Sequence, residues 1–158
     1  FFLFRLVISE ILTGFHLSPV YLTSPLYFIV YFKCDYRVPS VNGYDKQSAA
    51  QVKNIGHTVK VTFSNGPHDD IWVKDYGISV SRYEFSQAHF HWGDNDTHGS
   101  EHTINGKAFP MEMHLVHWNL DVGKNLTEAV RKDTRAALEV LGVHFKIGKN
   151  KGKFNFQF

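Results

Sequence analysis

The sequence predicts a mostly β fold, built on a central, largely antiparallel and twisted sheet with few short helices. Two observations predict this class. Several segments alternate between apolar and polar residues, or are rich in β-branched and aromatic residues, and turn sequences separate them. Only one segment has the residue spacing of a helix. The chain has 158 residues, of which 43% are hydrophobic, and this is enough apolar material for the core of one domain.

Five segments are expected to form strands. They are residues 57–63, 79–92, 100–104, 109–118 and 140–147. The first alternates residue by residue, which is the period of a half-buried strand. Residues 65–69 and 94–99 have the composition of turns and loops. Asn105 and Gly106 form the strongest short-range signal for a hairpin turn.

One helix is expected to begin after residue 125, where the period of the sequence changes. Asn125 is placed to cap this helix, and Glu128 lies in its first turn. Leu126, Ala129 and Val130 have the spacing that gives a helix one buried side. These three residues should therefore form the buried side of the helix.

The first 37 residues differ from the rest of the chain. They are rich in Phe, Leu, Ile and Tyr but show neither the helical nor the alternating period. Arg5, Glu10, Pro19 and Pro25 interrupt the apolar runs, whereas a transmembrane helix needs about 20 apolar residues. A cleaved signal sequence also fits poorly. We therefore expect residues 1–37 to be an unassigned hydrophobic segment without a clear membrane span, followed by one domain over residues 38–158.

Charge and cysteine content exclude several classes of function. The formal net charge is +2, from 17 Lys and Arg against 15 Asp and Glu. These charges are scattered rather than gathered into the basic stripe of a nucleic-acid-binding protein, so no nucleic-acid partner is expected. Cys34 is the one cysteine, which excludes an internal disulfide and a zinc site built from cysteines.

Histidine is the residue type in unusual supply, because six of the ten histidines lie within residues 87–119. His89 and His91 are two apart on a predicted strand, so their side chains leave the same face. His114 lies on the next long strand. If these strands are neighbours, three imidazoles converge from rigid backbone. Zinc accepts histidine nitrogens, and a site with three protein ligands keeps its fourth position open.

Two more polar residues share the faces of these histidines. Gln87 has the parity of His89, and Glu112 has the parity of His114. Residues so placed could orient the imidazoles by hydrogen bonding. An H-x-H pair alone is more often a pair of surface or hydrogen-bonded histidines, and Gln87 and Glu112 alone are ordinary polar strand residues. Together the five residues favour a metal site.

The motifs around these residues resemble the signature blocks of the α-class carbonic anhydrases. The matching blocks are residues 89–93 (HFHWG), 99–103 (GSEHT) and 113–119 (MHLVHWN), with weaker matches at 54–57 (NIGH) and 138–142 (LEVLG). Their order and spacing agree with the family as well as their letters do. The resemblance covers about residues 38–147.

The resemblance implies a role for each matching position. His89, His91 and His114 match the zinc ligands, and Gln87 and Glu112 match residues that orient two of those ligands. Two positions match catalytic residues: His57 matches a proton shuttle, and Glu101 matches a buried carboxylate that accepts a hydrogen bond from a threonine hydroxyl. Val116, Leu138 and Val140 match the apolar wall of the substrate pocket. His102 and His117 match structural positions, whereas His16, His68, His98 and His144 match no functional position.

The implied activity is the zinc-dependent, reversible hydration of carbon dioxide to bicarbonate and a proton, by attack of a zinc-bound hydroxide. Carbon dioxide and bicarbonate are the expected small-molecule partners, and sulfonamide-type inhibitors are expected from the resemblance. Members of the family that the motifs resemble continue for roughly a hundred residues past the position of Phe158. The N-terminal segment of the family is also not recognisable in this sequence.

The missing segments leave an alternative open. Over the 158 residues alone, the chain is expected to have little activity and to aggregate, because a shortened sheet exposes unpaired strand edges. The alternative function is therefore a non-catalytic zinc-binding or interaction module. A metal barrel of the cupin type also uses an H-x-H pair, but expects a glutamate soon after it, where this sequence has Asp94 and Asp96.

Two triplets bear on localisation. Asn95-Asp-Thr97 and Asn125-Leu-Thr127 are acceptor sequences for N-glycosylation. Asn95 lies in an expected loop, whereas Asn125 is explained equally well as a helix cap. The pair favours a secreted or extracellular protein, and a cytoplasmic location stays open.

Overall fold

The computed structural model of the chain describes residues 2–6, 21–22, 40–46, 48–63, 71–74, 81–132 and 136–148. These residues form ten strands and one helix. The elements are β1 (Phe2–Leu6), β2 (Tyr21–Leu22), β3 (Ser40–Asn42), β4 (Ala50–Asn54), β5 (Val59–Phe63), β6 (Trp72–Lys74), β7 (Arg82–Trp92), β8 (Thr103–Ile104), β9 (Met111–Asn119), α1 (Leu126–Arg131) and β10 (Leu138–Phe145). The predicted mostly β class is confirmed.

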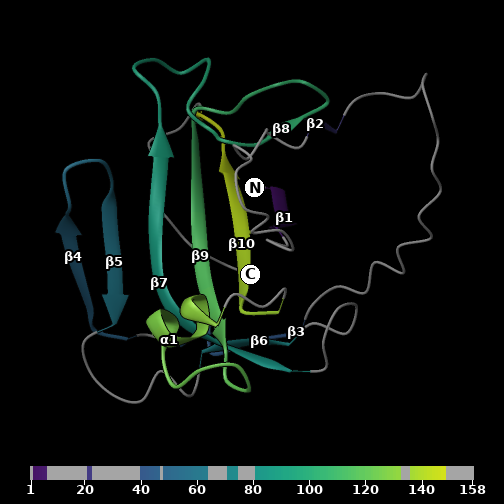
Figure 1. Ribbon diagram of the computed structural model, residues 1–158. Helices are drawn as coiled ribbons and strands as arrows, with labels where there is room; N and C mark the ends of the chain where they lie inside the picture. Colours follow the sequence, from purple (N-terminus) through teal and green to yellow (C-terminus); the bar gives the residue numbers. More distant parts are fainter. Residues whose placement is uncertain are drawn as a thin grey trace.

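Eight of the strands form one sheet, in which β1, β10, β9, β7, β5 and β4 follow one another. Neighbouring strands along this path are antiparallel. β6 pairs with the first residues of β7 and with β3, and β2 pairs with β8 in a separate parallel pair. Figure 1 shows β7 and β9 in the middle of the sheet, with α1 across their lower ends. The two long strands therefore position whatever their side chains carry.

A β-bulge in β7 decides which side chains share a face. Phe85 pairs with His117, but Gln87 pairs with Val116, so Ser86 is one extra residue in β7. An extra residue reverses the alternation of the strand beyond it. Phe85 therefore points to one face of the sheet and Gln87 to the other, and every second residue after Gln87 follows it.

One face of the sheet carries the hydrophobic core. The buried cluster consists of Ile71, Val73, Phe85, Ala88, Met113, Leu115, Leu141, Val143 and Phe145. On β9 and β10 the core residues are every second residue, because opposite faces alternate along a strand. The residues between them, which include His114 and Val116, lie on the second face.

The turn and cap predictions are confirmed in detail. Asn105 and Gly106 both have positive φ, 52° and 73°, as a type I′ turn requires, and two hydrogen bonds of 3.1 Å join Ile104 and Lys107 across the turn. The side chain of Asn125 caps α1, accepting a hydrogen bond of 2.9 Å from the backbone N–H of Glu128.

The predicted buried side of the helix is wrong at one residue. Ala129 is fully buried, but Val130 is 40% exposed. Successive helix residues are rotated by about 100°, so Val130 faces solvent while Ala129 is buried and Leu126 is partly buried.

Several strand boundaries differ from the predictions. β5 begins two residues later than expected, β9 begins two residues later and ends one later, and β10 begins two residues earlier and ends two earlier. β8 is shorter than expected, and β1, β2, β3, β4 and β6 were not predicted. All residues of β4 are exposed, so the strand has no alternation to detect. Residues 65–69 and 79–80, together with His16, Cys34 and His68, lie outside the described residues.

Residues 1–37, for which no element was expected, contribute β1 and β2 to the described part of the chain. β1 pairs with β10 over five residues. Among the described residues, no helix is long and apolar enough to cross a membrane.

A polar pair formed by buried His117 and partly buried Tyr44 lies against the core. His117 is fully buried, its Nδ1–H donates to the carbonyl oxygen of Glu139 at 3.2 Å, and the Tyr44 hydroxyl donates to its Nε2. Burial lowers the pKa of His117 to about 4 and raises that of Tyr44. Both side chains are therefore neutral at pH 7, and each uses its partner to satisfy its polar atoms.

The pair predicts a loss of stability in weak acid. An unfolded histidine takes up a proton near its ordinary pKa of 6.5, whereas folded His117 does so only near 4. The contribution of neutral His117 to the free energy of unfolding is therefore complete above pH 6.5. It falls as the pH drops toward 4, and at pH 5 the loss is about 2 kcal/mol. Urea denaturation at pH 7 and pH 5 should show a loss for the parent that exceeds the loss for His117→Gln by that amount. Equal losses would contradict this account.

Candidate metal centre

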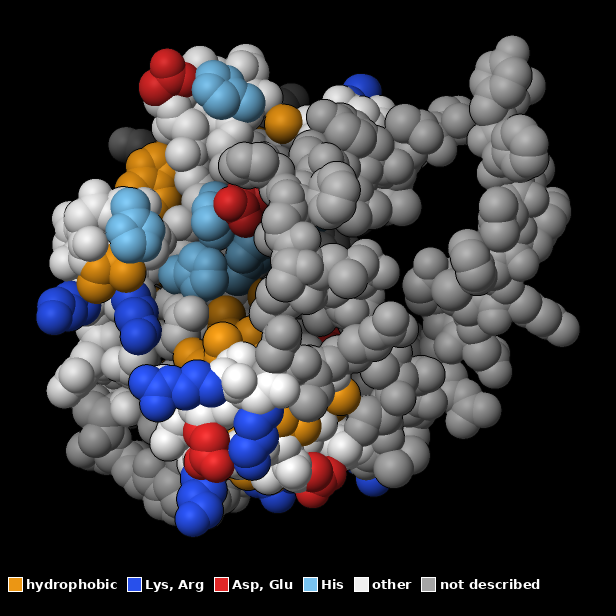
Figure 2. Space-filling view, in the orientation of Figure 1, with side chains coloured by type: hydrophobic (Ala, Val, Ile, Leu, Met, Phe, Trp, Pro, Cys, Tyr) orange, Lys and Arg blue, Asp and Glu red, His pale blue; other side chains and the backbone are white. Residues whose placement is uncertain are grey.

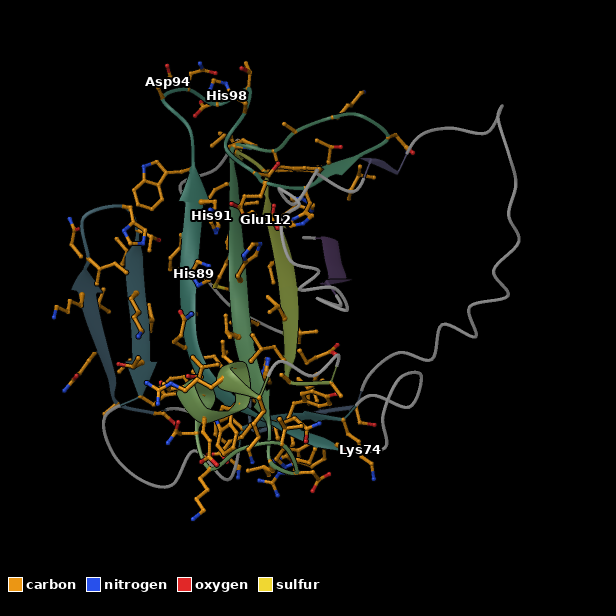
Figure 3. All side chains as sticks on the ribbon, in the orientation of Figure 1. Lys74, His89, His91, Asp94, His98 and Glu112 are labelled. Carbon is orange, nitrogen blue, oxygen red and sulfur yellow. The ribbon has the colours of Figure 1, made fainter. Side chains whose placement is uncertain are left out.

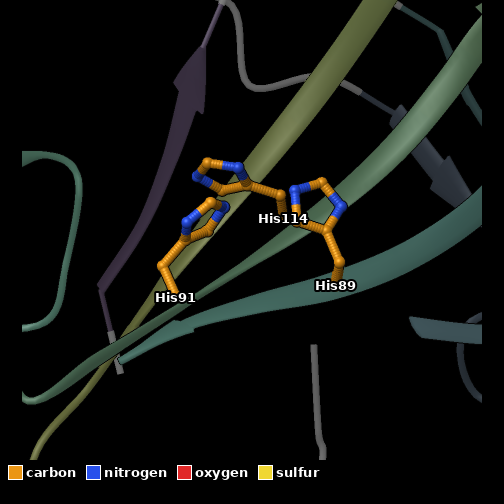
Figure 4. A group of neighbouring side chains, drawn as sticks. All are labelled: His89, His91 and His114. Atoms are coloured by element: carbon orange, nitrogen blue, oxygen red, sulfur yellow. The ribbon is translucent and has the colours of Figure 1, made fainter. Parts of the chain in front are cut away.

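Three histidines converge on the face of the sheet opposite the core. β7 places His89 directly opposite His114 of β9, and His91 follows two residues along β7. The ring centroids of His89 and His91 are 5.1 Å apart, those of His89 and His114 are 5.2 Å apart, and those of His91 and His114 are 4.6 Å apart. One nitrogen from each ring lies within 4.8 Å of the others. Figure 4 shows the three rings turned toward one another, and Figure 3 shows His89 and His91 along β7 near Glu112.

Hydrogen bonds fix which nitrogen of two rings faces the centre of this cluster. His89 donates from Nδ1 to Gln87 Oε1 at 3.0 Å, which leaves its Nε2 free to bind a metal. His114 donates from Nε2 to Glu112 Oε1 at 2.5 Å, which leaves its Nδ1 free. A metal-binding histidine is commonly held in this way, with the second nitrogen bound to a carboxylate or carbonyl.

The third ring, that of His91, has a nitrogen without a hydrogen-bond partner where a metal would be held. His91 Nε2 is buried and has no hydrogen-bond partner within the described part of the chain. A buried polar nitrogen without a partner costs free energy unless a ligand satisfies it. Together with the free nitrogens of His89 and His114, it makes a set of three imidazole nitrogen donors that fits a divalent transition metal.

The electrostatics of the cluster also suit a cation. Burial, followed by the charges of His114 and His91, lowers the pKa of His89 to about 4. Burial lowers the pKa of His91 as well, although Glu101 opposes this shift. Neutral imidazole is the form that binds a metal, so His89 and His91 need lose no proton at pH 7 to do so.

Glu112 is the most buried charged group of the site, with no exposed surface. Burial alone would raise its pKa, but hydrogen bonds from His102 and His114 outweigh burial and lower it. His102 donates to Oε1 from Nδ1 at 2.6 Å and to Oε2 from its backbone N–H at 2.9 Å. The same bond raises the pKa of His102. Glu112 is thus held by the loop that precedes β9 as well as by β9 itself.

Glu101 was expected to be buried, and this expectation is wrong: its side chain is 51% exposed. Its Oε1 lies 3.2 Å from His91 Nδ1 and its Oε2 lies 3.8 Å from His114 Nδ1. No threonine hydroxyl is bonded to it among the described residues. Its carboxylate instead borders His91 and His114.

His57 lies at the exposed turn between β4 and β5. The next residue, Thr58, donates its hydroxyl to the carbonyl of Phe90 at 2.6 Å and accepts the N–H of Phe90 at 3.0 Å. These bonds attach the turn to β7 beside His89. The charge of His57 is one of the causes that lower the pKa of His89, which places the two imidazoles within electrostatic reach of each other.

The three predicted wall residues lie on the same face as the histidines. Val116 pairs with both Gln87 and Val140 across the sheet, and Leu138 is two residues from Val140. Val116 and Val140 are buried and Leu138 is partly buried. Figure 2 shows the histidine side chains gathered in the middle of this face, with hydrophobic side chains below them.

His144 is the residue of this region that sequence reasoning missed. It lies directly opposite Glu112 in the pairing of β10 with β9, and it is 1% exposed. The sequence could have indicated it only through the register of these two strands, because no motif includes it.

Comparison with known proteins agrees with the geometry. Residues 18–157 match the family described as eukaryotic-type carbonic anhydrase. The chain is similar to carbonic anhydrase 1 of Oryctolagus cuniculus, with 39% identity over 106 residues, and to carbonic anhydrase 3 of Sus scrofa, with 37% identity over 117 residues. These matches cover 67% and 74% of this chain. The chain spans 43% of the length of each of these relatives.

Alanine substitutions test the proposed ligand set. His89→Ala, His91→Ala and His114→Ala should each weaken zinc binding by more than about 100-fold, the upper end of what loss of a mere orienting residue costs. His98→Ala is the matched control, because His98 is exposed in the loop after β7 and pairs with Asp94 at 3.1 Å. Competition against a fluorescent zinc chelator measures each affinity. Equal losses in all four variants would refute the assignment.

Proposed function

The chain belongs to the eukaryotic-type carbonic anhydrase family, and from this premise we propose that it binds zinc through His89, His91 and His114 and catalyses the reversible hydration of carbon dioxide to bicarbonate. The observation that carries the proposal is the convergence of three histidine nitrogens within 4.8 Å on one face of the sheet. Zinc in such a site would lower the pKa of water in its open position to about 7 and so supply a nucleophile at neutral pH.

The residues of the chain suit this chemistry. Neutral histidines leave the full positive charge of the metal to act, whereas carboxylate or thiolate ligands would offset it. Gln87 and Glu112 hold two rings in the required tautomers. Val116 and Val140 present an apolar surface on the same face, which suits a small, uncharged and linear substrate.

A proton must leave the site in each turnover, and His57 is the residue that we propose to carry it. An imidazole titrates near neutral pH and can both accept and release a proton. His57 is exposed to solvent, and the neighbouring Thr58 is hydrogen-bonded to Phe90 beside His89, so His57 lies on a turn between the histidine cluster and bulk water.

The second candidate is a non-catalytic zinc-binding or interaction module. The exposure of Glu101 favours it, because a half-exposed carboxylate beside His91 orients a nucleophile less firmly than a buried one. Zinc binding alone does not separate the two candidates, since both include it. Turnover does.

Stopped-flow hydration of carbon dioxide tests the catalytic proposal. The zinc-loaded chain should accelerate hydration, a sulfonamide-type inhibitor should suppress the acceleration, and His91→Ala should abolish it. The sulfonamide is expected to act because it competes for the open position of the metal. A chain that holds one zinc and shows no hydration above the rate of free zinc would establish the second candidate instead.

Substitution of His57 tests the proton pathway. In weakly buffered solution, His57→Ala should lower the turnover number by roughly 10-fold or more, because a fixed proton carrier is lost. Added imidazole should restore most of the rate, since a diffusing base can replace the fixed one. His98→Ala should have no effect under either condition. If His57→Ala turns over as fast as its parent at low buffer, His57 carries no protons.

A further inference from the structure

We propose that His144 is a positioning residue of the metal centre, which acts through the backbone of His102 and through Glu112 to hold His114 in its metal-binding tautomer. This inference rests on the proposed metal site. It concerns a residue that lies on β10, outside the three histidines and the two side chains that orient them.

The side chain of His144 lies on the face of the sheet opposite the core, where it contacts Glu112 and the loop before β9. Its Nε2 lies 2.9 Å from the carbonyl oxygen of His102 and 3.5 Å from Glu112 Oε2. Its ring stacks on Phe109 with centroids 4.2 Å apart and planes at 26°. A histidine buried to this degree loses its hydration, so its N–H must find a fixed acceptor. The acceptor it finds is the carbonyl of His102.

That carbonyl belongs to the loop that reaches Glu112. Ser100 donates its hydroxyl to the same oxygen at 2.8 Å, and two further bonds of 2.9 Å join Ser100 with Phe109 across the loop. The loop is thereby closed beside β10, and His144 is the contact by which β10 holds the carbonyl of His102.

The position of His102 decides how Glu112 is held. Both the backbone N–H and the ring Nδ1 of His102 donate to the carboxylate of Glu112, one to each oxygen. A carboxylate that is bound at both oxygens cannot rotate. Its Oε1 is then presented to His114 Nε2 at 2.5 Å, and His114 keeps its proton on Nε2 and its Nδ1 free.

The charges around His144 are consistent with this role. Glu112 Oε2 lies 3.5 Å from His144 Nε2, and the carboxylate of Glu112 is surrounded by His102, His114 and His144. Without the donors that surround it, a buried carboxylate is costly to keep ionised. Loss of any one of these three imidazoles therefore weakens the hold of the other two on the carboxylate of Glu112.

Two substitutions separate positioning from packing. His144→Phe keeps an aromatic ring against Phe109 but removes the N–H donor, whereas His144→Gln keeps a donor. We expect His144→Phe to weaken zinc binding by about 10-fold to 100-fold, the range for residues that orient ligands, and His144→Gln to recover most of the affinity. Phe109→Leu, the matched control, removes the stacking and should lower the urea midpoint with little effect on zinc affinity.

A second measurement needs no zinc and reports the tautomer of His114 itself. Long-range ¹⁵N–¹H correlation spectra of the metal-free parent chain should show His114 as a single tautomer protonated at Nε2, and His144→Phe should show a mixture of both tautomers. If the parent His114 is itself a mixture, or if His144→Phe binds zinc as tightly as its parent, His144 does not position the site. A parent chain that shows the single tautomer but binds no zinc would overturn the proposed metal site, whereas a parent that binds zinc and a His144→Phe variant that keeps the single tautomer would overturn this inference alone.

Discussion

The pairing of β7 with β9 is the constraint on which the rest of the structure depends. Antiparallel pairing sets His89 opposite His114 and His91 opposite Glu112, so four polar residues from two strands share one face. Side chains alternate along a strand, and a shift of one residue in this register would move the histidine of β9 into the core and Met113 or Leu115 to the site. The buried cluster around Met113 and Leu115 resists such a shift, so the hydrophobic core also holds the site in register.

The buried carboxylate of Glu112 is the second constraint, and it links the site to the surrounding loops. Removing one partner from a buried, hydrogen-bonded charge typically costs about 3–5 kcal/mol, so the groups around Glu112 cannot move independently. His102 comes from the loop before β9, His114 from β9 and His144 from β10. Three separate parts of the chain must therefore be in place before Nδ1 of His114, one of the three proposed metal ligands, is oriented. A site of this kind forms with the fold rather than before it.

Much of this arrangement could be predicted from the sequence, because its signals are local. The spacing of His89 and His91 fixes their common face, the Asn105-Gly106 pair fixes a turn, and Asn125 fixes the start of α1. Other features depend on partners that no local pattern reveals. The bulge at Ser86 is visible only in the pairing of two strands, and β4 has no buried side to set a period. His144 and the exposure of Glu101 follow from how β10 and a loop meet the sheet, so sequence spacing could not indicate them.

X-ray absorption at the zinc edge of the zinc-loaded chain tests the central claim most directly, because it reports the ligands themselves. The account predicts three histidine nitrogens at about 2.0–2.1 Å and a fourth ligand that does not come from the protein. A spectrum that requires four protein ligands, or a carboxylate or sulfur in place of one imidazole, would contradict it. In that case the cluster of His89, His91 and His114 would not be an open zinc site.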